Sequence, residues 1–268
     1  MRVCGDASEE GGCIRGPEGR KKGEYWEGSY AKAVCCDPGQ SGEVNYFRAL
    51  FNAKKLLIRD TTVPREMLFV GYESPLMRVT HKKVGEEYFN SRILSCDLVG
   101  MENSCLYGIE GKTNSGHEDT GLAYALLESF AYGCCLQYHI DSHCDDLKKE
   151  IHLCRKIFQG INEPCWQPAI PLSAKYFIAA PSQYYADHVS NQKLIGRLQQ
   201  ARRIEMALAK SCPKEFFGGY LMLPDEKDQP TLLQDMGTVE GRRCPVFSMQ
   251  SVTAQLFPKL ESVDEYIR

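Results

Sequence analysis

The stretch Ser95–Thr113, SCDLVGMENSCLYGIEGKT, contains the pattern that decides the fold. Two apolar runs typical of strands, Arg92–Met101 and Leu106–Thr113, lie on either side of the polar segment Glu102–Ser104. Short apolar runs joined by a few polar residues predict two strands and a tight turn. We therefore expect two strands that lie side by side, with Asp97 inside the first.

The charged residues of these two strands predict a chemical site. Glu110 and Lys112 are two residues apart in the second strand, which places both side chains on one face. Asp97 and Glu110 both lie in apolar runs, where a charged side chain is costly unless it has a function. Two converging carboxylates make an oxygen site suited to magnesium, with the Gly111 carbonyl as a further ligand. Lys112 would then position a water that the metal activates.

The other segments predict an α/β fold with a mixed sheet flanked by helices. Apolar periodicity and strand-type runs predict the following elements in chain order: helix Glu43–Ile58, strands Met67–Tyr72 and Leu76–Val84, helix Gly121–Tyr138, helix Asp145–Phe158, strand Lys175–Ala180, helix Gln192–Lys210 and strand Phe217–Leu223. The polar, Gly-rich residues 1–24 are expected to be flexible, and residues 25–268 to form one domain.

Composition narrows the class of protein. The 268 residues are 43% apolar and 25% charged, which is ordinary for a globular protein. The net charge is −3, so nucleic-acid binding would need a local basic face. The 13 cysteines include no CxxC pair, which argues against a zinc ribbon or an iron–sulfur cluster and favours free thiols in a reducing cytoplasm. We expect no signal peptide and no membrane span.

The site residues resemble those of the PD-(D/E)XK nuclease superfamily. The resemblance covers roughly residues 43–181 and leaves a C-terminal extension of helix and strand. The family core runs helix, three strands, helix, strand, a restriction-endonuclease-like αβββαβ order. Its acidic residue on the second strand matches Asp97, and its E-x-K element matches Glu110 and Lys112. Cys96 stands where the family pattern has proline.

The resemblance implies a magnesium- or manganese-dependent nuclease that hydrolyses phosphodiester bonds, with DNA the favoured substrate and endonuclease action and a homodimer possible. Asp97, Glu110 and Gly111 would hold the metal, and Lys112 would position the attacking water. Glu128 and Tyr132, one turn apart on the next helix, would support the site. An upstream glutamate often completes such a site, and three candidates stay open: Glu43, Glu86 and Glu87. The alternative is a catalytically inactive module of the same fold that binds nucleic acid or a protein partner.

Other residue groups leave further interpretations open. Four basic residues of the Gln192–Lys210 helix could contact phosphates or simply face solvent: Lys193, Arg197, Arg202 and Arg203. Four aromatic residues could stack on bases, although core packing explains them as well: Tyr176, Phe177, Tyr184 and Tyr185.

Cysteine and histidine spacing gives two further alternatives. Cys135, His139 and His143 would share one face of an unbroken helix and could bind zinc, but a helix end near Asp141 would separate them. A cysteine hydrolase using Cys134 or Cys135 is disfavoured because both thiols lie in mid-helix, away from a helix N-terminus.

Overall fold

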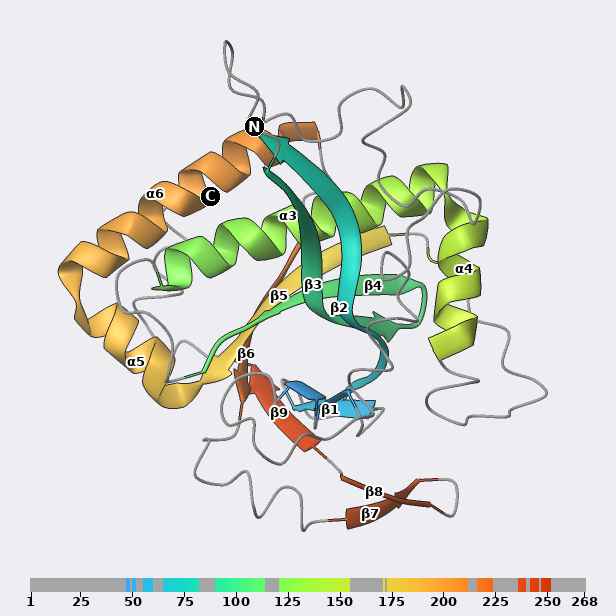
Figure 1. The fold of residues 1–268 in the computed structure, drawn as a ribbon. Helices are drawn as coiled ribbons and strands as arrows, with labels where there is room; N and C mark the ends of the chain where they lie inside the picture. Colours follow the sequence, from blue (N-terminus) through green and yellow to red (C-terminus); the bar gives the residue numbers. More distant parts are fainter. Residues whose placement is uncertain are drawn as a thin grey trace.

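The fold is taken from a computed structural model (Figure 1). The structure describes residues 47–48, 50–51, 55–59, 65–81, 90–113, 121–154, 171, 173–211, 216–223, 236–239, 242–245 and 247–251. The predictions for residues 1–24, for residues 155–158 of the second long helix, and for Glu43, Glu86 and Glu87 lie outside the described residues.

The strands form a mixed sheet that closes on itself in the order β1-β2-β3-β4-β5-β6-β9. The neighbours β2, β3 and β4 are antiparallel, whereas β4, β5 and β6 are parallel. The strand bounds are β1 Lys55–Arg59, β2 Arg65–His81, β3 Asn90–Glu102, β4 Cys105–Gly111, β5 Ser173–Pro181, β6 Phe217–Leu223 and β9 Phe247–Ser251. A separate hairpin joins β7 (Met236–Val239) to β8 (Arg242–Pro245).

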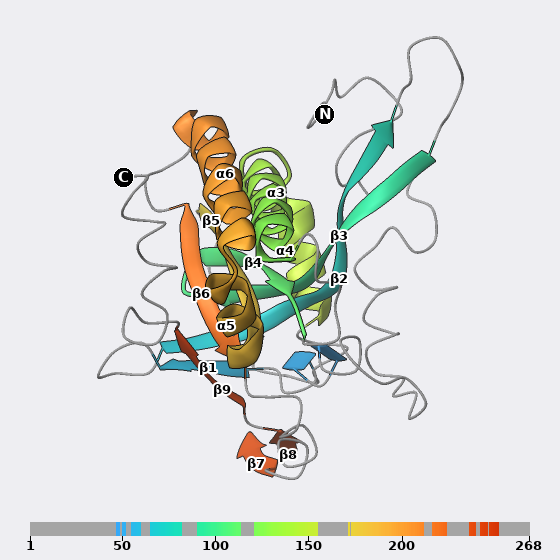
Figure 2. The same cartoon turned by 90° about the vertical axis from the view of Figure 1, so that its left-hand side faces the viewer.

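The helices that the structure describes along their whole length are α3 Gly121–Ser142, α4 Cys144–Leu153, α5 Ser182–Ser190 and α6 Gln192–Leu208. The long helices α3 and α6 lie side by side, and α3 also packs against β4 and β5 (Figures 1 and 2). Apart from its last turn, α3 is covered on most of its surface, which explains why its sequence is apolar with almost no polar face. One helix therefore connects the sheet to the outer helical layer.

The predicted α/β class, with a mixed sheet and flanking helices, is confirmed. The predicted helix Glu43–Ile58 is wrong at its end, because Lys55–Arg59 forms β1, which pairs with both β2 and β9. Pairing with strands remote in sequence overrides the local helical periodicity there.

The two strands predicted over Met67–Tyr72 and Leu76–Val84 are one strand, β2, as far as His81. Residues 73–75 between them form no turn; the pairing of β2 with β3 instead has register shifts at Phe69/Gly71, within the first predicted strand, and at Pro75/Met77. Sequence analysis also missed α5 and left β7, β8 and β9 unassigned. The strands that carry the predicted site, β3 and β4, lie as expected, and residues 103–104 make the turn between them.

Candidate active site

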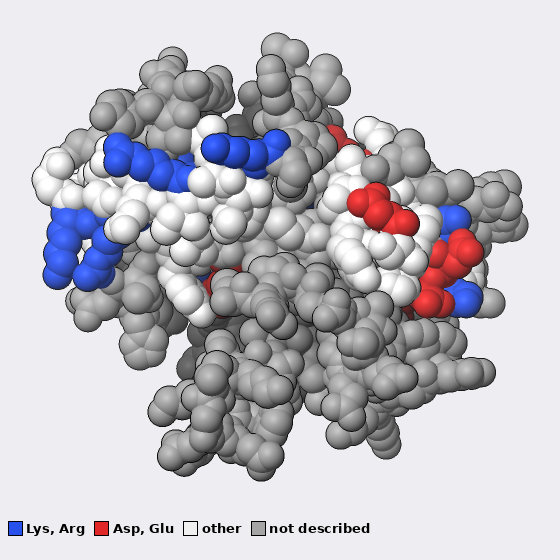
Figure 3. All heavy atoms as spheres, turned by 90° about the horizontal axis from the view of Figure 1, so that it is seen from above, with Lys and Arg blue, Asp and Glu red and all other residues white. Residues whose placement is uncertain are grey.

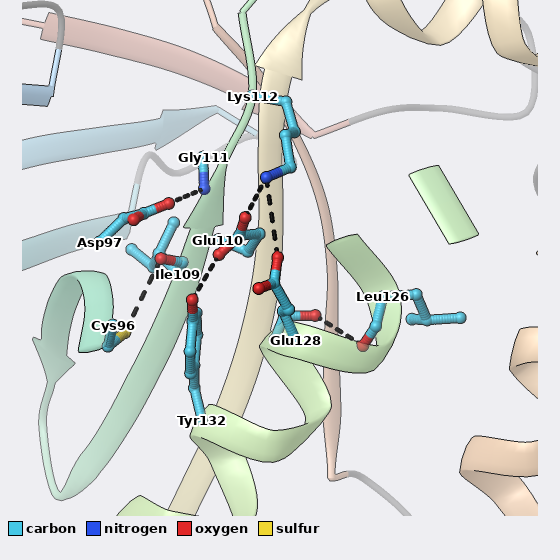
Figure 4. A network of polar contacts seen from close by, with 10 residues as sticks. Cys96, Asp97, Ile109, Glu110, Gly111, Lys112, Leu126, Glu128 and Tyr132 are labelled. Atoms are coloured by element: carbon cyan, nitrogen blue, oxygen red, sulfur yellow. Dashed lines mark hydrogen bonds and ion pairs between the residues drawn. The ribbon is translucent and has the colours of Figure 1, made fainter. Parts of the chain in front are cut away.

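The end of the β3–β4 pair brings the two predicted carboxylates together. The register pairs Leu98 with Ile109, and one further step along both strands places Asp97 opposite Glu110. Residues opposite each other in an antiparallel pair point to the same face. Asp97 Oδ2 also accepts a hydrogen bond from the backbone N–H of Gly111 at 2.8 Å, which fixes this carboxylate against β4 (Figure 4).

Glu110 is a buried carboxylate with two side-chain partners. It is 2% exposed. Tyr132 donates its hydroxyl to Glu110 Oε2 at 2.7 Å, and Lys112 Nζ donates to Oε1 (Figure 4). A buried charge is tolerated only when it is paired and hydrogen-bonded, and Glu110 meets both conditions.

Lys112 lies just after the end of β4, but its backbone still pairs with β5 as the strand does. Its backbone N–H donates to the carbonyl of Ala179 in β5 at 2.8 Å, so its side chain stays on the face of Glu110. Lys112 Nζ also lies 3.8 Å from Glu128 Oε2. Burial alone would lower the Lys112 pKa, but the carboxylates of Glu110, Asp97 and Glu128 outweigh it and raise the pKa. Lys112 is therefore charged at neutral pH.

Glu128 completes this group from α3. Burial and the neighbouring Glu110 carboxylate raise its pKa to about 7, against the opposing effect of Lys112. Glu128 therefore keeps its proton to a higher pH than an ordinary surface glutamate does. The arrangement therefore holds one fixed cation among three acidic side chains, one of which exchanges its proton near pH 7.

Two features of the sequence allow α3 to reach the strand. Glu128 and Tyr132 are four residues apart, so both side chains lie on the same face of the helix. A Cβ on Gly108 would lie only 2.7 Å from the Tyr132 Cβ, so glycine permits the close approach of α3 to β4. The small residue at position 108 therefore sets the distance at which Tyr132 reaches Glu110.

Cys96 precedes Asp97 and lies wholly buried beneath this group. Burial raises the pKa of its thiol, and the Sγ lies 2.9 Å from the carbonyl oxygen of Leu98. A neutral, buried thiol is inert, so Cys96 supports the strand and takes no part in the chemistry.

The structure brings together five predicted site residues: Asp97, Glu110, Lys112, Glu128 and Tyr132 (Figure 4). Within the described residues, no group of three or more His, Cys, Asp or Glu side chains is arranged to hold a metal ion. Sequence analysis missed Tyr124, whose phenol has its pKa raised chiefly by the charge of the Glu128 carboxylate; its spacing of four residues from Glu128 was the available signal.

The basic residues of α6 differ in their surroundings. Basic side chains are spread over the end of the molecule where α6 lies, whereas both signs of charge mix at the opposite end near α4 (Figure 3). Lys193 and Arg203 are exposed. Arg202 instead forms an ion pair with the buried Glu205, which also accepts a hydrogen bond from Tyr176. Arg202 therefore balances an internal carboxylate.

The aromatic and zinc alternatives find little support in the described residues. The four aromatic candidates lie in the core, with exposures of 0–5%, as the packing interpretation expects: Tyr176, Phe177, Tyr184 and Tyr185. His139 Nε2 lies 3.0 Å from the carbonyl oxygen of Leu76. His143 follows the last residue of α3, its ring centroid 5.9 Å from that of His139, but within the described residues these two and Cys135 are not grouped to hold a metal ion.

No protein-family model matches the chain, and neither a curated protein nor a solved structure matches it. Among the helices that the structure describes, none has the length and apolar character needed to cross a membrane.

Proposed function

We propose that the chain is a metal-dependent nuclease that hydrolyses phosphodiester bonds, most readily in DNA. The observation that carries the proposal is the meeting of Asp97, Glu110 and Lys112 at the end of the β3–β4 pair. The order β2, β3, β4, α3, β5 supports a restriction-endonuclease-like arrangement of the core. Carboxylates and a lysine on paired strand ends also agree with the resemblance to PD-(D/E)XK nucleases.

The donor atoms at this position fit a small divalent cation. Magnesium commonly takes one or two protein carboxylates and completes its shell with water and substrate phosphate oxygens. Asp97 and Glu110 would supply two such carboxylates, and the carbonyl of Gly111, whose N–H donates to Asp97, would be a further ligand. A cation held there would neutralise negative charge on the scissile phosphate and promote ionisation of the attacking water.

The protein's own side chains perform the remaining tasks. Lys112, kept cationic by its acidic neighbours, would orient the attacking water and stabilise charge that develops on the phosphate. Tyr132 holds the Glu110 carboxylate in place through its 2.7 Å hydrogen bond. Glu128 accompanies Lys112 and, with its pKa near 7, can supply or accept a proton at neutral pH.

Cleavage of labelled DNA in Mg²⁺ or Mn²⁺ tests the proposal. Asp97→Asn keeps an oxygen for the Gly111 N–H but removes the charge, so we expect cleavage to fall at least about 100-fold while the protein stays folded. Asp141→Asn, on the exposed end of α3, is the matched control and should cleave like the wild type. Unchanged cleavage by purified Asp97→Asn would refute the proposal.

One observation favours a second candidate, a catalytically inactive module that binds nucleic acid or protein. Lys112 and Tyr132 donate hydrogen bonds to the two oxygens of Glu110, which leaves fewer lone pairs for a metal ion. Calorimetric titration with Mn²⁺ separates the two candidates. A heat of binding that Glu110→Gln abolishes supports the enzyme, whereas its absence in the wild type supports the inactive module.

A further inference from the structure

Helix α3 exposes one side chain beside the site. From Gly121 to Ile140, a range that the structure describes completely, every residue except Tyr124 is buried or partly buried. Tyr124 is 51% exposed. A half-exposed aromatic ring next to a polar site offers an apolar face on which a planar group of a ligand can stack.

Tyr124 begins a polar stripe that leads from solvent to the buried carboxylate. Tyr124, Glu128 and Tyr132 follow each other at intervals of four residues on one face of α3. Tyr124 is exposed, the Glu128 side chain is 24% exposed, and Tyr132 is buried against Glu110. The Glu128 carboxylate and, secondly, burial raise the pKa of the Tyr124 phenol, which agrees with the place of the two side chains on one face of α3. The ring of Tyr124 therefore stands at the solvent end of the stripe.

We infer that the Tyr124 ring stacks on an unpaired base next to the scissile phosphate, so that the site prefers single-stranded nucleic acid. This inference rests on the proposed nuclease function. Four residues of α-helix span about 6 Å, which places Tyr124 roughly one nucleotide away from Glu128. Within a duplex, neighbouring pairs cover both faces of a base, so only an unpaired or terminal base offers a face to the ring.

Binding of a fluorescein-labelled 12-nucleotide single strand, followed by anisotropy, tests the inference. The Asp97→Asn background prevents cleavage during the measurement. We expect Tyr124→Leu to weaken binding about tenfold, the order for one stacked base, and Tyr124→Phe to bind within about twofold of its parent. His152→Ala, on α4 and also exposed, is the control and should leave binding unchanged.

A second comparison isolates the stacked base. With a duplex of the same sequence whose two ends are closed by non-nucleotide linkers, so that no base face is open, Tyr124→Leu should change the affinity less than twofold. With single strands that carry one abasic nucleotide at successive positions, one position should abolish the difference between Tyr124→Leu and its parent.

Three outcomes overturn the inference: equal losses for Phe and Leu, equal losses on single strand and duplex, or no loss for Leu. Each of these leaves the proposed function standing if the wild type still cleaves DNA. Failure of the wild type to cleave or bind any strand removes the proposed function, and the inference falls with it.

Discussion

The hydroxyl of Tyr132 matters at the scale of a single residue because it serves a buried carboxylate. Tyr132→Phe removes the donor to Glu110 Oε2 and leaves that oxygen without this partner. We expect the free energy of unfolding to fall by about 1–3 kcal/mol, measured by urea denaturation in EDTA. Tyr124→Phe removes the hydroxyl of a side chain that is 51% exposed and should cost less than about 0.5 kcal/mol. Equal losses in the two variants would contradict the role of Tyr132 as the support of Glu110.

The titration of a single residue, Glu128, makes the stability of the folded protein depend on pH. Its pKa rises from an ordinary 4.5 to about 7 in the folded protein because of burial and Glu110. The folded state therefore binds its proton more tightly than the unfolded state does, and this contribution to stability falls as pH rises from about 4.5 to about 7. Above that window, the ionised Glu128 makes the folded state less stable than a neutral side chain would.

Glu128→Gln should flatten this part of the profile. We expect the variant to lose less stability than the wild type between pH 5 and pH 8, in metal-free buffer and followed by urea denaturation. Asp141→Asn on the exposed end of the same helix should retain the wild-type slope. A Glu128→Gln profile parallel to that of the wild type would show that Glu128 titrates as an ordinary glutamate.

At the scale of elements, the site depends on how closely α3 packs against β4. Gly108→Val would place side-chain atoms where the Tyr132 Cβ already lies, so α3 must shift or the strand must bend. We expect a loss of about 1–3 kcal/mol in the free energy of unfolding, together with loss of cleavage. Gly196 in α6 has no atom within 4 Å of an added Cβ, so Gly196→Ala should instead stabilise the protein by up to about 1 kcal/mol. An unchanged free energy of unfolding in Gly108→Val would show that α3 and β4 pack loosely at this position.

The features that sequence analysis predicted well are those that depend on residues close together in the chain. Period-two alternation fixed Glu110 and Lys112 on one face, and the short turn at residues 103–104 brought Asp97 beside them. β1 could not be predicted in this way because its strand conformation depends on pairing with β9, far along the chain. The exposure of Tyr124 could not be predicted from the sequence either, because it depends on how neighbouring elements cover α3.

At the scale of the whole molecule, the net charge of −3 means that a nucleic acid must find a local basic surface. Lys193 and Arg203 are exposed on α6, whereas Arg202 pairs with Glu205 inside the molecule. If α6 contacts phosphates, the first two residues carry the salt dependence of binding. The double variant Lys193→Ala with Arg203→Ala should then lower the slope of log K against log salt by about 1.5, because each lost phosphate contact contributes about 0.7–0.9.

The matched control lies at the other end of the molecule. Lys148 and Lys149 of α4 pair with Asp145 and Asp146, so Lys148→Ala with Lys149→Ala removes the same charge from a locally neutral surface. Anisotropy titrations of the labelled single strand from 50 to 200 mM salt, in the Asp97→Asn background, should give the parental slope for this control. Equal reductions in both double variants would mean that diffuse charge governs binding, and no reduction in either would place the phosphate contacts away from α6. A reduction confined to the α6 variant would make this helix the surface along which the strand approaches the site.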